Sequence, residues 1–189
     1  VSDGDRLLFI SKECHSNGCA ATVDVTYPSA PLYLLYNPEL LWGMLEPVFD
    51  FAAMPVWEFD FAPHDVGTYP LCIGQVYGLK NRKDRFACNH FSIGETEKGR
   101  FTHLPYYLYP AGNEVYDFDW QMPVEECSNM IILTCAAQRL APKTLTAERR
   151  NMLEKWAGYL VDKGLIPENQ LCTDDFAGHL DKNANLSVK

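Results

Sequence analysis

Apolar residues recur at helical spacing in three long stretches of the chain. The first stretch follows Asn37-Pro38-Glu39, which provides a capping residue, a proline at the first helical position and an acid in the first turn. Apolar side chains then recur to about Ala53, and a kink or break is expected at Pro47, inside this stretch. These side chains are Leu41, Met44, Leu45, Val48 and Phe49. The pattern predicts a helix from Pro38 to about Ala53.

Two further stretches predict helices in the second half of the chain. One helix is expected from about Pro123 to Leu140, because Pro142 prevents it from continuing. The next should begin near Thr146 and stop at Gly164, a residue type that often follows the last turn. Its expected buried stripe consists of Met152, Leu153, Trp156 and Leu160.

Weaker signals predict shorter elements between and beyond these helices. The first thirty residues mix short apolar runs with Ser, Asn and Gly, and are expected to form loop or short strand. A short helix is expected from Leu32 to Tyr36, and another after His64-Asp65-Val66-Gly67 as far as about Tyr77. Residues 185–189 look like the start of a last helix. Together these elements predict an all-α domain of five or six helices arranged in antiparallel hairpins.

The longest irregular stretch covers residues 78–121. It is basic from Lys80 to Arg85 and aromatic from Tyr106 to Trp120. We expect a hairpin or a long loop that crosses one face of the domain, with the insertion centred on residues 80–119. Loops of this length usually have a function or are mobile. The aromatic side chains would either wall a pocket or belong to the core.

Length and charge limit the classes of function. The 189 residues, 47% of them apolar, suffice for one domain with its own core. A net charge of −9 argues against nucleic acid or an anionic membrane as the main partner. No apolar run approaches the roughly 18 residues that would span a bilayer. The sequence starts at Val1 without a signal peptide, so we expect a processed or trimmed piece.

Seven cysteines are present, at positions 14, 19, 72, 88, 127, 135 and 172. Their odd number leaves at least one thiol without a partner inside the chain, and we interpret most of them as small buried side chains. Cys14-His15 and Cys19 resemble half of a metal site, but no second pair at ligand spacing completes it, so no metal is expected. Cys127 adjoins two glutamates, yet its expected burial disfavours a role as nucleophile.

The two adjacent glutamates, Glu125 and Glu126, fall in the first turn of an otherwise apolar helix. Glu125 shares a helical face with Ser128 and Asn129, whereas Glu126 aligns with Met130. We therefore expect Glu125 to have the polar neighbours. Acids in a first turn also stabilise the helix dipole by roughly 0.3–1 kcal/mol, so a catalytic role and a structural role both stay open.

Two other segments concentrate polar groups. One turn of the chain contains His64, Asp65 and Tyr69 close together. Asp65 could act in acid–base chemistry. Alternatively, His64 or Asp65 could simply cap the helix that follows. Thr173-Asp174-Asp175, followed by Asn185, forms an acidic loop of a kind that is usually solvated. Two carboxyl groups that face one pocket can divide the work, one donating a proton and the other accepting one.

Taken in order, these segments make the chain resemble the glutaminase A family, specifically the six-hairpin helical domain of a bacterial-type member. The resemblance covers nearly the whole chain apart from residues 80–119. The matching stretches are Ser16-Asn17-Gly18, Thr22-Val23-Asp24-Val25-Thr26-Tyr27-Pro28-Ser29-Ala30-Pro31, Asn37-Pro38-Glu39-Leu40-Leu41, Ala62-Pro63-His64-Asp65-Val66-Gly67-Thr68-Tyr69-Pro70, Met122-Pro123-Val124-Glu125-Glu126-Cys127-Ser128-Asn129, and Thr173-Asp174-Asp175-Phe176-Ala177-Gly178 through Asn185-Leu186.

The resemblance implies an (α/α)6 toroid related to the six-hairpin glycosidases. A complete ring needs about twice the helices predicted here, so residues 1–189 would be a single domain that forms about half of it. The family implies a secreted or periplasmic multidomain protein that hydrolyses L-glutamine to L-glutamate and ammonia. A glycoside hydrolase is the alternative within the superfamily. A non-catalytic half-domain that needs the rest of the toroid is another.

The resemblance also suggests which residues would act. Carboxyl groups at one rim would serve as general acid and base, namely Asp65, Glu125, Glu126, Asp174 and Asp175. The substrate would be positioned by His64, Tyr69, Asn129 and Asn185. Expected partners are a small molecule, glutamine or a sugar, and the remaining domains of the polypeptide; no cofactor is expected. No G-x-S-x-G or S-x-x-K motif occurs, so serine-hydrolase machinery is not expected.

Overall fold

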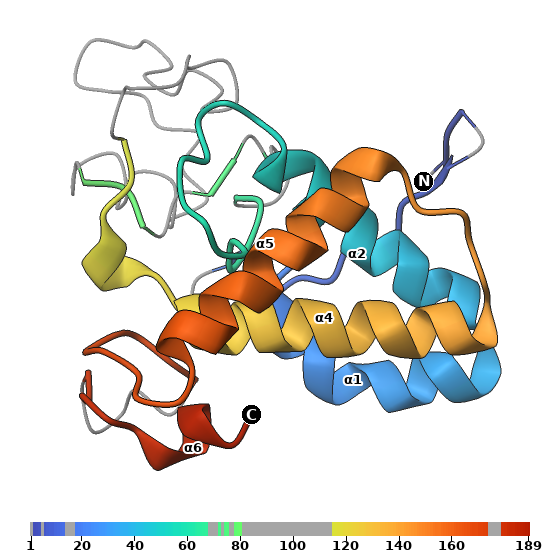
Figure 1. Cartoon of the computed structure of the whole chain (residues 1–189). Helices are drawn as coiled ribbons and strands as arrows, with labels where there is room; N and C mark the ends of the chain where they lie inside the picture. Colours follow the sequence, from blue (N-terminus) through green and yellow to red (C-terminus); the bar gives the residue numbers. More distant parts are fainter. Residues whose placement is uncertain are drawn as a thin grey trace, which may run out of the picture.

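Four long helices form the body of the computed structural model, which describes residues 2–4, 6–13, 18–67, 72, 74–75, 78–80, 115–173 and 179–189 (Figure 1). The long helices are α1 (Val23–Tyr36), α2 (Pro38–Ala52), α4 (Pro123–Leu140) and α5 (Ala147–Lys163). Shorter elements are the antiparallel strands β1 (Ser2–Asp3) and β2 (Arg6–Leu7), the 3-10 turn η2 (Phe118–Trp120) and α6 (Ala184–Ser187). The prediction of an all-α domain is confirmed.

Helix α4 occupies the centre of this arrangement. It packs against α1, α2 and α5, and α1 also packs against α2. The chain turns at Asn37 from α1 into α2, and residues 141–146 lead from α4 into α5, so two helical hairpins share one core. Figure 1 shows α1 running alongside α4, while α5 crosses it. None of the described helices is both long and apolar enough to span a membrane.

Three helices begin and end close to where the sequence predicts. The side chain of Asn37 accepts a hydrogen bond from the Glu39 N–H at the start of α2, and Thr146 accepts one from the Arg149 N–H at the start of α5. Helix α4 has no capping side chain of its own at Met122. The buried Gln170 replaces it, because its Oε1 accepts from the Val124 N–H at 3.0 Å. The predicted last helix is present as the single turn α6.

Helix α1 is longer than predicted. The sequence indicates loop before Pro31 and a helix only from Leu32, whereas the helix begins at Val23 and includes Pro28 and Pro31. Both prolines lie on its exposed side. A carbonyl that loses its helical partner to proline can bond to water there, which explains why the helix tolerates both.

The helix predicted after Gly67, as far as about Tyr77, is wrong for the three residues of that stretch that the structure describes. Residues 72, 74 and 75 are not helical. Cys72 has φ of 47° and Gly74 has φ of 110°, and these left-handed values are incompatible with an α-helix. The insertion that follows is joined at its ends by an antiparallel bridge between Leu79 and Tyr116. The choice between hairpin and loop for residues 81–114 lies outside the described residues.

Aromatic side chains from several elements fill the core. Trp156 of α5 is 1% exposed and stacks on Phe49 of α2 with ring centroids 5.5 Å apart. Tyr116 packs against Trp57 and Phe51, and its hydroxyl donates to a buried carbonyl at 2.7 Å. Among the described residues of the aromatic stretch, Tyr116 therefore belongs to the core.

One buried ion pair also joins α2 to α5. The guanidinium of Arg149 meets both carboxylate oxygens of Glu46, and the Glu46 side chain is only 7% exposed. Arg6 lies 3.6 Å from the same carboxylate, but it donates to both oxygens of Asp50 at 2.9 and 3.0 Å. The second and fourth long helices are thus held together by a charged contact beside the aromatic stack.

Candidate active site

A buried polar cluster forms where the first turns of α1 and α4 meet the loop before residue 68. It consists of Asp24 from α1, His64 from the loop and Glu126 from α4, called the Asp24–His64–Glu126 cluster below. One oxygen or nitrogen atom from each of the three lies within 4.8 Å of the others. The His64 and Glu126 side chains are buried, while the Asp24 side chain is 13% exposed. Asp24 therefore lies at the edge of the cluster nearest to solvent.

The imidazole of His64 is held from both sides. Its Nδ1 lies 2.8 Å from Oδ2 of Asp65, and its Nε2 lies 3.4 Å from Oδ1 of Asp24, an ion-pair distance without an aligned hydrogen bond. The second oxygen of Asp65 accepts from the Gly67 N–H at 2.7 Å. Gly67 has φ of 111°, a value that favours glycine. The His64 carbonyl accepts from the Val23 N–H at 2.9 Å, so the loop is fixed to the start of α1.

Glu126 and Asn129 form the deepest part of the site, and both are 0% exposed. The Asn129 amide donates to Glu126 Oε2 at 3.0 Å, whereas Glu126 Oε1 and Asn129 Oδ1 have no hydrogen-bond partner within the described part of the chain. The expectation that Glu126 lacks polar neighbours is wrong, because Asn129 bonds to Glu126 and not to Glu125. Residues three apart also face each other on a helix, and this spacing brings the Asn129 amide to Glu126. The Ser128 hydroxyl instead donates to the Val124 carbonyl at 2.8 Å.

Burial and the charges of neighbouring groups shift the pKa values of Asp24 and Glu126 in opposite directions. Burial opposes ionisation of Asp24, but the close polar contact with His64 and its positive charge outweigh burial and lower the pKa of this carboxyl. Burial also disfavours charge on His64, yet the Asp24 and Asp65 carboxylates raise its pKa well above the usual value. Burial raises the pKa of Glu126 well above its usual value, and the charge of His64 offsets only part of this effect.

Glu125 holds a neighbouring loop in place. Its oxygens accept from the Thr173 N–H at 2.8 Å, from the Thr173 hydroxyl at 2.7 Å and from the Lys189 ammonium at 2.8 Å. The Thr173 hydroxyl also lies 3.4 Å from Oδ2 of Asp24. The Lys189 ammonium is 4.7 Å from the ring centre of Tyr27. Glu125 therefore secures Thr173 beside Asp24, with both of its oxygens already occupied.

The structure brings together some of the predicted site residues. His64, Asp65, Glu126 and Asn129 meet in one buried cluster. Asn185 is exposed on α6, where its N–H donates to Asn183 Oδ1 at 2.9 Å. The other predicted site residues, Tyr69, Asp174 and Asp175, lie outside the described residues, as do Cys14 and His15 of the half metal site.

Asp24 belongs to the site, but sequence reasoning did not select it. It occurs in the stretch Thr22–Pro31 that carries part of the resemblance. The signal that could have identified it is its place in the first turn of a helix. That signal was hidden because Pro28 and Pro31 made the segment look like a loop.

Cys127 is not suited to be the nucleophile. Its side chain is 0% exposed, and its sulfur accepts from the Ala62 N–H at 3.4 Å. Burial raises the pKa of this thiol to about 12, so the thiolate that a nucleophile requires does not form near neutral pH. Cys19 and Cys172 are buried as well, whereas Cys72 is half-buried and Cys135 is exposed, so three of the five described cysteines fit the interpretation as buried side chains.

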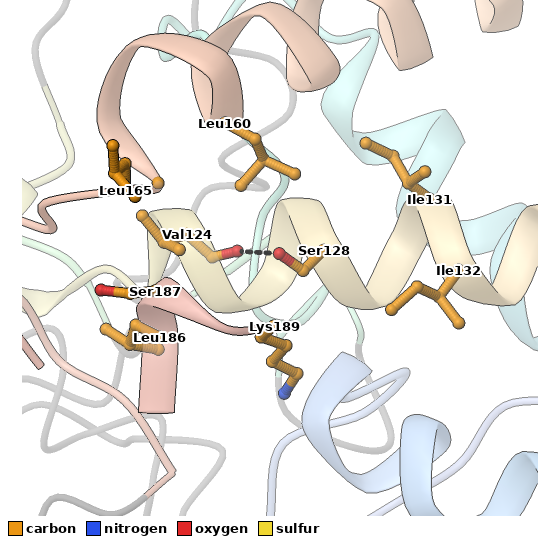
Figure 2. A pocket seen from close by; sticks show the side chains of 10 residues that line it. Val124, Ser128, Ile131, Ile132, Leu160, Leu165, Leu186, Ser187 and Lys189 are labelled. Atoms are coloured by element: carbon orange, nitrogen blue, oxygen red, sulfur yellow. Dashed lines mark hydrogen bonds between the residues drawn. The ribbon is translucent and has the colours of Figure 1, made fainter. Parts of the chain in front are cut away.

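A separate pocket of about 300 Å³ lies along another face of α4, between the end of α5 and α6 (Figure 2). Its lining is largely apolar and includes Val124, Ile131, Ile132, Leu160, Leu165 and Leu186. The hydroxyl of Ser128 donates to a carbonyl of its own helix, and Lys189 is paired with Glu125. No carboxyl group lines it among the described residues, which distinguishes it from the buried cluster.

Comparison with known proteins assigns the family. A family model described as "Glutaminase A six helical-hairpin domain" matches residues 1–189. The chain belongs to the glutaminase A six-helical-hairpin family. The resemblance to the glutaminase A family is thereby confirmed, and the two helical hairpins found here agree with the hairpin architecture that the family description names.

The chain matches only a part of the length of two curated relatives. Glutaminase A of Aspergillus oryzae is 33% identical over 187 residues, which are 98% of this chain and 21% of the relative. A protein of Arthroderma benhamiae named "Probable glutaminase" is 30% identical over 207 residues, 98% of this chain and 24% of the relative. The chain thus spans about a fifth to a quarter of these proteins. No solved structure matches the chain.

Proposed function

We propose that the protein to which this chain belongs hydrolyses L-glutamine to L-glutamate and ammonia, and that the Asp24–His64–Glu126 cluster takes part in the reaction. The names of both curated relatives support the substrate. One observation carries the assignment to this cluster: two carboxyl groups from different helices approach the same imidazole, within 4.8 Å, in contrasting surroundings. Pairs of acids in unlike environments are typical of sites that use one as acid and the other as base.

The surroundings of the two carboxyl groups suggest their roles. Asp24 faces the His64 imidazole and the Thr173 hydroxyl, both at 3.4 Å, and these groups favour its anion. As the more exposed member, Asp24 would accept the proton of the attacking water. Glu126 Oε1 faces no donor, which favours a neutral carboxyl that can protonate the departing nitrogen. The positive charge of His64 would stabilise the oxyanion that forms on the amide carbonyl of the substrate when water attacks it.

Several expectations from the resemblance stay predictions. These are the roles of Asp174, Asp175, Tyr69 and Asn185, the secreted or periplasmic location, and the need for the remaining domains of the polypeptide. The glycoside hydrolase and the non-catalytic half-domain also stay alternatives, and product analysis separates both from an amidase.

The test offers glutamine and a panel of glycans side by side to the full-length protein and measures ammonia and released sugar. Asp24→Asn and Glu126→Gln should each lower ammonia release by about 10²–10⁴-fold, the usual contribution of a general acid or base. Asp60→Asn is the matched control, because the Asp60 side chain is 73% exposed and its ion pair is with Lys155 of α5, not with the cluster. Sugar release without ammonia, or wild-type rates in both cluster variants, would contradict the proposal.

A further inference from the structure

Two buried carboxylate oxygens of the cluster make no hydrogen bond to the described part of the chain. They are Oδ1 of Asp24 and Oε1 of Glu126. A buried polar atom without a partner is costly, and such atoms in native structures often mark the place of a water or an ion. One carboxylate oxygen from each of the two residues and one nitrogen of His64 lie within 4.8 Å of one another. Three potential ligand atoms thus face one another in a buried place.

The chemistry of these three groups favours a zinc-like ion. One imidazole nitrogen with two carboxylates is a donor set that Zn²⁺ accepts, and three protein ligands leave a fourth position for water. A tetrahedral ion with bonds of about 2.0–2.1 Å separates its ligand atoms by about 3.3 Å. His64 Nε2 and Asp24 Oδ1 are already 3.4 Å apart. An oxygen of Glu126 lies within 4.8 Å of a ligand atom of each, so Glu126 completes the set by moving closer to them.

The groups behind these ligands are arranged as in metal sites. The Asp65 carboxylate lies 2.8 Å from Nδ1 of His64, which leaves Nε2 on the side of Asp24, and Asn129 donates to Oε2 of Glu126 at 3.0 Å. A second set, formed by Cys19, His64 and Asp65, is similarly close. Both Asp65 oxygens already have partners, from the imidazole and from a backbone N–H, so Asp65 serves better as a support than as a ligand.

We infer that Asp24, His64 and Glu126 bind a divalent cation of the zinc type, with Asp65 and Asn129 as supporting residues. The inference goes beyond the proposed hydrolysis and does not require it. It describes a different state of the same groups: with the ion bound, His64 would be neutral and Glu126 ionised, and the ion would supply the positive charge in place of His64. Binding can be measured without substrate, so a protein that fails to hydrolyse glutamine can still bind the ion. Conversely, a protein that hydrolyses glutamine without binding Zn²⁺ would overturn this inference alone.

The test titrates chelator-treated full-length protein with Zn²⁺ in a calorimeter near neutral pH. The wild type should show one more site than His64→Gln and Glu126→Gln, each of which removes a ligand. Asp65→Asn keeps all three ligands and should weaken this site by about 10–100-fold, as expected for a supporting residue. Asp60→Asn, an exposed acid four residues from His64, should bind as the wild type does.

Circular dichroism confirms that each variant folds before it is titrated. If a ligand variant does not fold, Asp65→Asn decides the question, because its weaker binding is measured with the ligand set intact. The inference would be overturned if the wild type had the same number of Zn²⁺ sites as His64→Gln. Unchanged affinity in Asp65→Asn together with unchanged stoichiometry in Glu126→Gln would also overturn it.

Discussion

The ion pair between Arg149 and Glu46 offers a quantitative test of how α2 and α5 are held together. Replacing Arg149 by Met removes the guanidinium but keeps most of the aliphatic stem. Glu46 would then be a carboxylate only 7% exposed that has lost both of its close hydrogen bonds. Breaking a buried pair by removing one partner costs about 3–5 kcal/mol, because an uncompensated charge remains.

Two features of the structure place the expected loss at the low end of that range. Arg149 is 18% exposed, so water can replace part of the lost contact. Arg6 lies 3.6 Å from Glu46 and can move closer, although it would have to leave Asp50. We therefore expect Arg149→Met to lower the local free energy of unfolding by about 3 kcal/mol. The double variant Glu46→Leu with Arg149→Met should recover most of it, because no buried charge is left unpaired.

The assay is hydrogen exchange of the α2 and α5 amides in the full-length protein, which reports the free energy of opening of this helical unit. Local exchange is preferable to a melting curve, since a multidomain protein need not unfold in two states. A loss below about 0.5 kcal/mol in the single variant would show that the pair behaves like a surface salt bridge. A double variant as unstable as the single one would refute the explanation by unpaired charge.

Three further predictions concern other contacts. Gly78→Ala should destabilise the protein by about 1–3 kcal/mol in thermal unfolding. The new Cβ would lie 1.9 Å from the buried Gln121 amide nitrogen and break the hydrogen bond that this nitrogen donates to Gln75. Unchanged stability would contradict this prediction. Gln170→Ala should cost about 1–2 kcal/mol by uncapping α4, read as faster exchange of its first-turn amides, and Gln170→Glu should retain the cap. Glu125→Gln should lower glutamine hydrolysis less than Glu126→Gln does, because Glu125 only holds a loop; equal losses would place both in the chemistry.

The helices that carry capping signals were predictable from the sequence, and the helix that lacks them was not. Asn37-Pro38 and Thr146 mark the starts of α2 and α5 by interactions within four residues, so local sequence suffices. The cap of α4 comes from Gln170, 46 positions away from Val124, and no local pattern shows it. Helix α1 was missed because the exposed position of its prolines depends on how the helix packs.

The candidate site was predictable in part. Glu126, His64 and Asp65 lie in motifs that combine polar groups with helix starts or turns, and these motifs are visible in one sequence. Which glutamate faces the cluster depends on the rotation of α4, which is set by its packing against α1, α2 and α5. Asp24 can be predicted as a site residue only after the segment that contains it is recognised as the helix α1. The partner that holds Glu125 is Thr173, and a contact over 48 positions leaves no periodic trace in the sequence.

The approach of Thr173 to Asp24 joins positions that are 149 residues apart. Closing so long a loop is entropically expensive until many other contacts exist, whereas each helical hairpin can form from neighbouring residues. We therefore expect the helices to appear early in refolding and the cluster to be completed late. A refolding chain would regain its helical circular dichroism before it regains an intact polar site, so helix content by itself would overestimate the competent fraction.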